Sequence, residues 1–473
     1  MLNLNDVLIA IAGENSWNAD SPISEFVIDS RQATPNSLFI ALPGEHANGH
    51  DFISSAFANG AQFSLIDREM PSEHTILDLR KGKVDPSTQL PTPPFCLLVD
   101  DALTALQSVA SYWRDKFDLR VIGITGSVGK SSTKELTASI LSSRFVTLKS
   151  AGNMNNEIGL PLTLLKLRPE HEITVLEMGF YVLGEIKLLC DIAKPQVGVI
   201  TNIGTVHAER AGSQEIIAKG KAELVKALPP APHGIAILNI DDPWVKGMGS
   251  QTKADIFYYG LSPEADLWAD EVTGLGLKGI RCRLHYQGEA LYIKAPLIGR
   301  HSVYTLLRAS AVALSEGMNW EDIVYGLRES KVQLRLSTVK TASGALLLDD
   351  TYNASPPSTL AALNLLHDLE GHKIAVLGDM LELGQYEHQG HVMVGIRAAE
   401  VADGIVLVGE RSKITVKAAI SAGFLANNIH WFADATHAAE YLRSTLKEGD
   451  IALIKGSHSM RMDKIVSILE EKN

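Results

Sequence analysis

The segment Ile122–Thr133 constrains the fold of this chain more than any other part of the sequence. It reads IGITGSVGKSST, so a β-branched apolar strand runs into a glycine-rich turn and then into a helix that begins with Lys and hydroxyl residues. Glycines let the backbone N–H groups of such a turn point at an anion, and the start of the helix adds partial positive charge. The usual spacing G-x-x-x-x-G-K-[ST] requires Gly at position 124, where Ile stands, so the motif is the shorter G-x-x-G-K-S built on Gly126 and Gly129.

This pattern predicts a cradle for the phosphates of a nucleotide such as ATP. Lys130 would neutralise the β- and γ-phosphates, and the hydroxyl of Ser131 would hold Mg²⁺. The residues expected to bind the phosphates form the loop and the first helical turn: Gly126, Ser127, Val128, Gly129, Lys130, Ser131 and Ser132. The alternative is a glycine-rich turn with a surface lysine, and the strand-turn-helix context favours the nucleotide site.

The length of the chain predicts several domains, because 473 residues are too many for one hydrophobic core. The fold class is α/β, with three blocks in sequence. Residues 1–98 form a small α/β module in which 68–94, polar and rich in proline, is an insertion or linker. Residues 99–329 carry the phosphate loop and apolar strands separated by helix-length segments, as in a parallel sheet with covering helices. Residues 330–473 repeat strand-like runs and helical patterns, as in an open, doubly wound, Rossmann-like sheet.

Composition limits the compartment and the partners. Cys96, Cys190 and Cys282 are far apart and form no C-x-x-C pair, which fits a reducing cytoplasm and buried apolar thiols. The sequence shows neither a basic leader nor an apolar run of about 18 residues, so we expect a soluble protein without a membrane span. The formal charge of −12 disfavours non-specific nucleic-acid binding, so anionic substrates must be held by local pockets.

A glutamate and a histidine lie at the ends of predicted strands of the second block. Glu177 ends the strand TVLEMG, where a carboxylate can hold Mg²⁺ directly or through water. His207 follows VGVITNIG and suggests a second divalent-metal site near the γ-phosphate. The alternatives are a solvated strand end for Glu177 and a loop histidine with its hydrogen bonds satisfied for His207.

The run AKGKAE at 218–223 follows on a predicted helix. Taken alone, it is better explained as a solvated charge run. A lysine amine is a poor magnesium ligand, whereas a CO₂-derived carbamate on a lysine would be an anionic oxygen ligand.

With these motifs in hand, the chain resembles the Mur ligase family, the ATP-dependent amide-forming enzymes of peptidoglycan precursor synthesis, over nearly its whole length. In the first block the resemblance rests on Asp29-Ser30-Arg31 and SLFIALPGEHANGHDF, and in the second on TGSVGKSST, NMNNEIGLP, LEMG and TNIGTVH. In the third it rests on DDTYNASP at 349–356, LGDMLELG at 377–384 and KGSHSMR at 455–461. These last runs resemble the subgroup that joins D-alanyl-D-alanine to UDP-N-acetylmuramoyl-tripeptide through an acyl phosphate, with ATP as the third substrate. We expect a cytoplasmic enzyme that acts as a monomer.

The resemblance also implies roles for individual residues. Lys130 and the loop amides would bind the ATP phosphates, Ser131 and Glu177 one Mg²⁺, and His207 a second metal ion. Lys221 matches a lysine that relatives carry as a carbamate. Asn156 lies where an asparagine orients the reacting groups, and Asn155 and Asn156 are both expected to bind the substrate. The remaining roles are nucleotide binding by Arg335, Asp350, Tyr352 and Asn353, and binding of the uridine end of the acceptor by Ser30 and Arg31.

Some residues depart from the family's motifs. Ser302 and Thr305 stand where the adenine segment H-N-x-x-N has asparagines, and a hydroxyl cannot supply the donor and acceptor pair of an amide. Ser355 replaces an asparagine, and Ser457-His458-Ser459 replaces a run that more often contains Arg-Gly. Two other functions therefore stay open at this point: another Mur-type amino-acid ligase, or a non-catalytic nucleotide-binding homologue.

Overall fold

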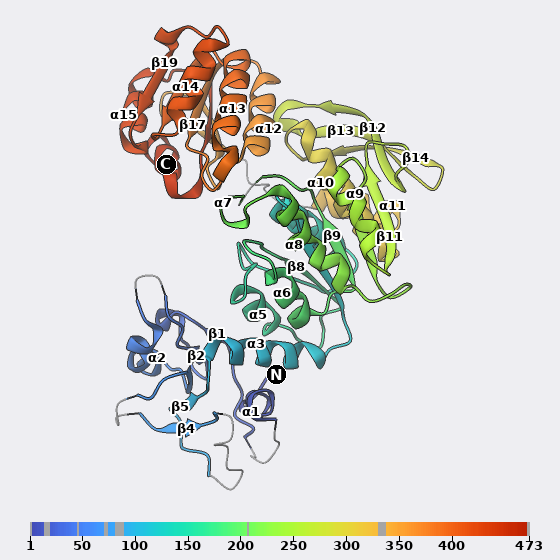
Figure 1. The fold of residues 1–473 in the computed structure, drawn as a ribbon, viewed down its shortest axis with the longest axis vertical. Coiled ribbons are helices and arrows are strands. Elements are labelled where there is room, and N and C mark those ends of the chain that lie inside the picture. The colour runs from blue at the N-terminus through green and yellow to red at the C-terminus, as the bar shows by residue number, and fades with distance from the viewer. Residues whose placement is uncertain are drawn as a thin grey trace. The chain divides into compact units, whose positions relative to one another are not determined.

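The structure is a computed structural model, and it describes residues 2–13, 19–44, 47–70, 74–80, 89–205, 208–329 and 337–470 (Figure 1). The chain divides into two compact units. The first comprises Met1–Gly123, Phe145–Gly179 and Glu185–Gln196, and the second comprises Ile124–Arg144, Phe180–Gly184 and Val197–Asn473. No helix in the described ranges is both long and apolar enough to span a bilayer.

The first unit begins with a five-stranded sheet of order β1-β2-β3-β5-β4, in which every pair is parallel. Its strands are β1 (Phe26–Val27), β2 (Leu38–Ile40), β3 (Phe63–Ile66), β4 (Ile76–Asp78) and β5 (Phe95–Leu98). The helices are α1 (Leu4–Ala12), α2 (Ile53–Ala58) and α3 (Ala102–Asp115). Phe39, Ile53 and Cys96 belong to one apolar core beside this sheet, as expected for an α/β module.

One part of the first block differs from the sequence-based expectation. The segment 68–94 contains β4, which pairs with β5, so it contributes a strand to the sheet. Leu77 and Leu79 are buried there. The signal was weak because the strand is three residues long and polar, proline-containing segments flank it.

A nine-stranded sheet of order β14-β13-β12-β11-β10-β9-β6-β8-β7 forms the centre of the chain. Its strands are β6 (Arg120–Thr125), β7 (Thr147–Lys149), β8 (Ile173–Glu177), β9 (Val197–Ile200), β10 (Ile235–Asn239), β11 (Asp255–Gly260), β12 (Leu267–Gly274), β13 (Ile280–Tyr286) and β14 (Glu289–Ala295). The helices of this region are α4 (Lys130–Leu141), α5 (Gly159–Leu164), α6 (Glu185–Ala193), α7 (Ala208–Ala211), α8 (Gln214–Ala227), α9 (Pro243–Gly247), α10 (Val303–Ser315) and α11 (Trp320–Glu329).

The central sheet is not purely parallel, contrary to the simple expectation. β12 pairs with β13, and β13 with β14, in antiparallel fashion. The turn between the last two strands consists of Gln287 and Gly288, with φ angles of 50° and 82°. Positive φ at both positions is typical of a type I′ turn, whose twist matches that of a hairpin.

The third sheet has the order β15-β16-β20-β17-β18-β19, and all its pairs are parallel except β15 with β16. Its strands are β15 (Ser337–Lys340), β16 (Leu346–Asp350), β17 (His372–Gly378), β18 (Gly404–Val408), β19 (Ile429–Phe432) and β20 (Asp450–Lys455). The helices are α12 (Pro356–His367), α13 (Glu387–Val401), α14 (Ser412–Ser421), α15 (Ala435–Thr445) and α16 (Asp463–Leu469).

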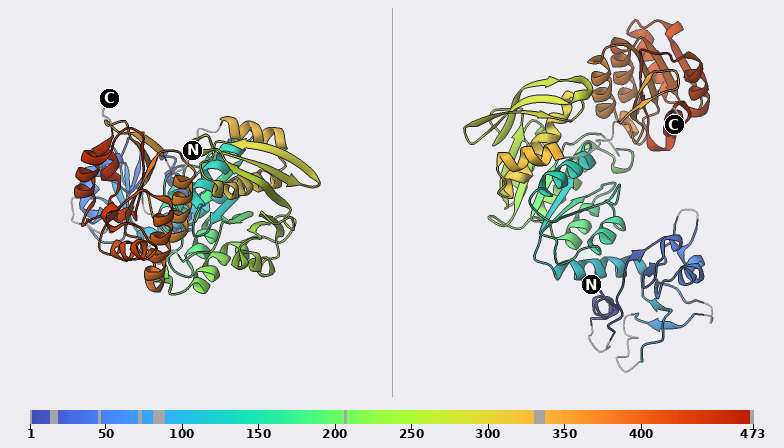
Figure 2. Two further views of the ribbon diagram at one scale, coloured as in Figure 1. Left: turned by 90° about the horizontal axis from the view of Figure 1, so that it is seen from above. Right: turned by 180° about the vertical axis from the view of Figure 1, so that it is seen from behind.

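Helices cover both faces of this third sheet, as Figure 2 shows. One apolar core joins the strands to residues of α12, α13 and α14, including Leu363 and Val394. A second core joins them to α15 and α16 through residues such as Leu442 and Ile465. The predicted doubly wound architecture is therefore confirmed, and the loops at the carboxyl ends of its strands are where such sheets bind ligands.

Candidate active site

The predicted strand, turn and helix are present as β6, the loop 126–129 and α4. Gly126 has φ 144° and Gly129, the residue before the helix, has φ 86°, both in a region that side-chain-bearing residues avoid. A Cβ atom on Gly126 would lie 1.8 Å from Thr201 Oγ1, so only glycine fits. The N–H groups of Lys130, Ser131 and Ser132 open the helix, where a helix has no intrahelical acceptor for them.

The loop is fixed from the side by residues that follow β9. Val128 N donates to Asn202 Oδ1 over 3.0 Å, and Asn202 Nδ2 donates to Val128 O over 3.1 Å. Gly204 N donates to Ser127 Oγ over 2.8 Å. Sequence analysis assigned Asn202 no role, although its place directly after an apolar strand was a signal that could have found it.

Two lysines meet at one carbonyl oxygen of the loop. Lys130 Nζ donates to Gly126 O over 2.8 Å, and Lys221 Nζ donates to the same oxygen over 3.1 Å. The side chain of Lys221 is buried, 1% exposed, and its Nζ lies 4.9 Å from the centre of the Phe180 ring. The reading of AKGKAE as a solvated charge run is therefore wrong for Lys221. It holds for Lys219, which is exposed and pairs with Glu215, because residues two apart on a helix point in different directions.

In the first unit the structure brings Asn155 and Glu177 together. Glu177, at the end of β8, is 2% exposed, so the alternative of a solvated strand end is wrong. Asn155 Nδ2 donates to Glu177 Oε1 over 2.9 Å, and Gly179 N donates to Asn155 O over 2.7 Å. Asn156 is exposed, and its Oδ1 accepts from Gly159 N over 2.9 Å at the start of α5.

The expected uridine-binding pair also lies in the first unit, in a short 3₁₀ helix of residues Ser30–Gln32. Ser30 is buried, whereas the side chain of Arg31 is 84% exposed. Arg31 Nε and Nη2 donate to the two carboxylate oxygens of Asp29 over 2.9 and 2.7 Å. This hydrogen bonding by Arg31 lowers the pKa of the Asp29 carboxyl, so the pair stays ionised at neutral pH.

Of the nucleotide-binding residues expected in the third block, Asp350 ends β16, and Tyr352 and Asn353 follow it. Asp350 Oδ2 accepts from Lys455 Nζ over 2.6 Å, and Asn353 O accepts from the same ammonium over 2.8 Å. Lys455 is 2% exposed at the end of β20 and had no assigned role. Tyr352 is exposed, and its ring centre lies 6.0 Å from that of His458. The predicted residues His207 and Arg335 lie outside the described residues.

The run LGDMLELG, at 377–384, has a structural explanation at its aspartate. Asp379 Oδ1 accepts from Ser412 N over 2.7 Å and Oδ2 from Arg411 N over 3.2 Å, so the carboxylate caps the start of α14. Leu381 N donates to Ser457 Oγ over 2.9 Å, which ties this run to the KGSHSMR segment.

The two departures in the adenine segment have internal partners. Ser302 Oγ donates to Ile298 O over 2.6 Å, and Thr305 Oγ1 accepts from Arg308 Nη2 over 3.1 Å. Both residues are buried. Their hydroxyls are thus occupied within the protein, which supports the expectation of an altered contact with adenine.

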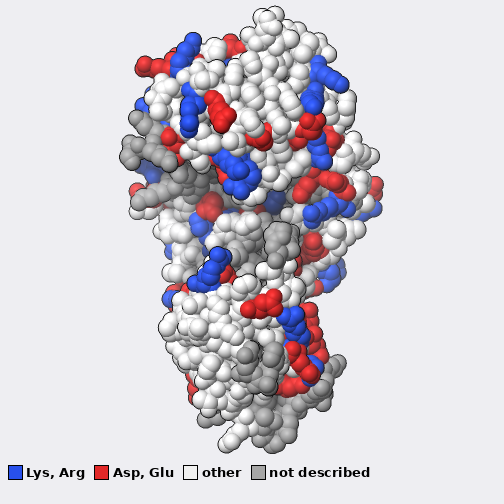
Figure 3. Space-filling view, turned by 90° about the vertical axis from the view of Figure 1, so that its left-hand side faces the viewer, with Lys and Arg blue, Asp and Glu red and all other residues white. Residues whose placement is uncertain are grey.

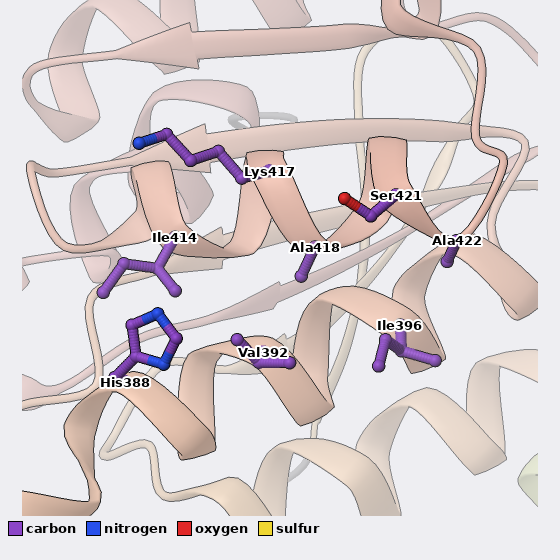
Figure 4. Close-up of a pocket in the computed structure, with 8 residues that line it drawn as sticks. All are labelled: His388, Val392, Ile396, Ile414, Lys417, Ala418, Ser421 and Ala422. Atoms are coloured by element: carbon purple, nitrogen blue, oxygen red, sulfur yellow. The ribbon is translucent and has the colours of Figure 1, made fainter.

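Among the described residues, no group of three or more His, Cys, Asp or Glu side chains is arranged to hold a metal ion. A cavity of about 520 Å³ is lined by Arg300 and His301 together with residues of α12 such as Leu360. A second cavity, of about 570 Å³, lies between α13 and α14 (Figure 4). Its lining is mostly aliphatic, with His388 and Lys417 at one end, and it contains none of the predicted site residues.

Charges of both signs are mixed on the face shown in Figure 3. An anionic ligand therefore depends on local donors such as the loop amides and lysines.

Comparison with known proteins identifies the family to which this chain belongs. Residues 22–77 match the family model described as "Mur ligase family, catalytic domain", 124–313 match "Mur ligase middle domain", and 334–458 match "Mur ligase, glutamate ligase domain". The chain is 35% identical to the UDP-N-acetylmuramoyl-tripeptide--D-alanyl-D-alanine ligase of Bacillus subtilis, over 94% of this chain and 92% of that protein. It is 34% identical to the ligase of the same name from Escherichia coli, over 96% and 95%.

Solved structures give the same result. The crystal structure of MurF from Acinetobacter baumannii has a TM-score of 0.84 and 31% identity, and the match covers 99% of this chain and 98% of that chain. MurF ligase from Thermotoga maritima, solved in complex with ADP, has a TM-score of 0.78 and 26% identity, with 94% and 96% covered.

Proposed function

Since the chain belongs to the Mur ligase family, we infer that it is an ATP-dependent, ADP-forming ligase of peptidoglycan precursor synthesis. It adds D-alanyl-D-alanine to UDP-N-acetylmuramoyl-tripeptide, the activity named for its relatives. The observation that carries this conclusion is the match over more than nine-tenths of both chains, 94% and 92% with the Bacillus subtilis enzyme. The family models also cover the phosphate loop, within 124–313, and the runs at 349–356 and 377–384, within 334–458.

The chemistry explains why the site needs a phosphate cradle. A carboxylate does not acylate an amine at neutral pH, because oxide is too poor a leaving group. The tripeptide carboxylate oxygen attacks the γ-phosphorus of ATP, the bond to the β-phosphate oxygen breaks, and ADP leaves an acyl phosphate. The amine of D-alanyl-D-alanine then attacks the acyl carbon, inorganic phosphate departs, and the nitrogen loses a proton. Lys130 and the amides of the loop would stabilise the negative charge that develops on the phosphoryl oxygens.

Magnesium fits the donors that this chain provides. The Ser131 hydroxyl and the buried Glu177 carboxylate are oxygen donors of the kind that Mg²⁺ prefers. In this proposal they hold one ion, His207 attends a second, and bound magnesium would supply further positive charge to the phosphates. Asn155, which donates to Glu177, would orient that carboxylate.

Lys221 is the residue we propose to carry a carbamate. Its burial and its place at Gly126 O put it beside the loop, where an anionic oxygen ligand would face a metal-bound nucleotide. Mass spectrometry of the intact chain under CO₂, with trapping of the carbamate by alkylation, tests this. A Lys221→Met variant is the control that must show no adduct at this site.

The remaining roles follow the same resemblance. We propose that Asp350 binds the ATP ribose, with Tyr352, Asn353 and Arg335 beside the nucleotide. Ser30 and Arg31 hold the uridine end of the acceptor, and Asn156 orients the reacting groups. We also propose that the chain acts as a monomer in the cytoplasm. Analytical sedimentation would test the oligomeric state, and cell fractionation would test the compartment.

A coupled phosphate-release assay tests the function. With UDP-N-acetylmuramoyl-tripeptide and MgATP, phosphate release should require D-alanyl-D-alanine, and single amino acids should not replace it. Release driven by a single amino acid would instead identify another Mur-type ligase. Absence of ADP formation with every acceptor would identify a non-catalytic homologue.

A further inference from the structure

Helix α10 buries one charged side chain in an otherwise uncharged, mostly apolar stretch. The helix reads VYTLLRASAVALS, and Arg308 is its only ionised residue at neutral pH. Arg308 is 4% exposed. Burying a guanidinium is costly unless hydrogen bonds and an opposite charge compensate it, so its presence needs a reason.

The guanidinium lies directly behind the phosphate loop. Arg308 Nε donates to Thr133 Oγ1 over 2.8 Å, and Thr133 Oγ1 in turn donates to Gly129 O over 2.7 Å. Nη2 donates to Thr305 Oγ1 over 3.1 Å. A Cβ atom placed on Gly129 would come within 2.9 Å of Nη2, so the charged group touches the glycine that precedes Lys130.

The described part of the chain offers Arg308 no ion pair. Its guanidinium carbon lies 5.9 Å from the centre of the Tyr259 ring, but burial raises the pKa of Tyr259 to about 12, so this phenol is neutral at pH 7. The carboxylate of Asp241, which acts on the same phenol, accepts from Tyr304 Oη and Leu261 N, over 3.0 and 2.6 Å.

We propose that Arg308 is a positioning residue for the nucleotide, whose buried positive charge finds its counter-charge in the phosphates of bound ATP. It acts through the loop: its hydrogen bond fixes Thr133 and thereby Gly129, and its charge adds to that of Lys130. Thr305, one of the two departures from the adenine motif, is its hydrogen-bonding partner. The inference rests on the proposed function only in taking ATP as the ligand.

The proposal predicts an effect that grows with the number of phosphates. Two unit charges roughly 10 Å apart, at an effective dielectric constant of about 20, interact strongly enough to change an affinity about tenfold. Arg308→Met, which keeps length but removes charge, should weaken ADP binding about tenfold and ATP binding more, and AMP binding least. Arg308→Lys should retain most of the ATP affinity.

Isothermal titration of the full chain with AMP, ADP and ATP in the presence of Mg²⁺ tests this. Arg328→Met, at an exposed position of α11, makes the same change in net charge and is the matched control, expected to bind all three like the parent. Equal losses for the three nucleotides, or unchanged ATP affinity in Arg308→Met, would overturn the proposal. If circular dichroism shows Arg308→Met unfolded, Arg308→Gln is titrated instead with the same criteria. A parent chain that binds no ATP would contradict the proposed function itself. Failure of the proposed function is therefore distinguishable from failure of the Arg308 proposal.

Discussion

Replacing Gly220 with alanine tests how the buried Lys221 is held. Gly220 lies within α8, and a Cβ atom there would lie 1.9 Å from Phe180 Cε2 and 2.6 Å from Cζ. The Phe180 side chain is 2% exposed, so its ring has little room to turn away. The same ring lies over Lys221 Nζ at 4.9 Å, so a displaced ring also displaces the lysine.

The expected magnitude follows from two opposing effects. Alanine stabilises a helix interior by about 1 kcal/mol relative to glycine. Carbon atoms normally approach to about 3.5 Å, so the Phe180 ring must move by roughly 1.5 Å, and overpacking of this kind costs about 1–3 kcal/mol. We expect Gly220→Ala to lower the free energy of unfolding by up to about 2 kcal/mol. Misplacement of Lys221 by about 1 Å should lower the ligase rate at least about tenfold.

Urea unfolding and the phosphate-release assay measure the two effects. Gly247→Ala is the control, because a Cβ atom at Gly247, the last residue of α9, meets nothing within 4 Å, and this variant should keep full activity. Adding Phe180→Leu to Gly220→Ala should restore part of the lost stability by relieving the contact. A Gly220→Ala chain that is more stable than the parent and equally active would refute the reasoning.

Three further predictions concern other parts of the molecule. Lys130→Met should lower the affinity for MgATP at least about tenfold in a calorimetric titration, since it removes a phosphate-neutralising charge, and an unchanged affinity would contradict the site. Lys455→Met should lower the free energy of unfolding by roughly 1–3 kcal/mol, because it leaves the Asp350 carboxylate without its ammonium partner. Adding Asp350→Asn to Lys455→Met should recover part of the lost stability. Losses that simply add in the double variant would argue against an ion pair between Lys455 and Asp350. Burial raises the pKa of Cys96 to about 12 and that of Cys282 to about 11, so both thiols stay protonated at pH 8. Both should react with a maleimide only after the chain unfolds. Rapid labelling of either thiol in the native chain, measured by mass spectrometry, would contradict this prediction.

Local patterns predicted most of the fold. Apolar runs bounded by glycine and charged residues predicted five of the six strands of the third sheet, β16 to β20, within a residue or two, because buried parallel strands are mostly apolar. The edge strand β15 was missed because three of its four residues, STVK, are polar. The hairpin of β13 and β14 was missed because alternating strands such as IRCRLHY look half-polar, and Gln287-Gly288 is a weaker turn signal than Asn-Gly.

In the candidate site, too, the residues of a local motif were predictable, and contacts between distant parts of the chain were not. The phosphate loop is contiguous in sequence, so its glycines and Lys130 were predictable. The contacts of Lys221, Arg308 and Lys455 were not, because each depends on an element far away in the chain; Lys455, for example, meets Asp350 across 105 positions. In the sequence these three residues look like ordinary surface charges. In the fold they are buried and contact the phosphate loop or the third sheet, and burial of this kind depends on tertiary packing, which a local sequence pattern does not show.

The position of β20 has a consequence for how the protein is made. This strand lies between β16 and β17, in the middle of its sheet, although it is synthesised after all of its neighbours. Until the ribosome has released residues 450–455, the nascent chain holds two separate fragments, β15-β16 and β17-β18-β19, each with an unpaired edge that invites association with other chains. Translation arrest or premature termination before this point should therefore yield aggregation-prone products, whereas the phosphate loop and its surrounding strands are already complete.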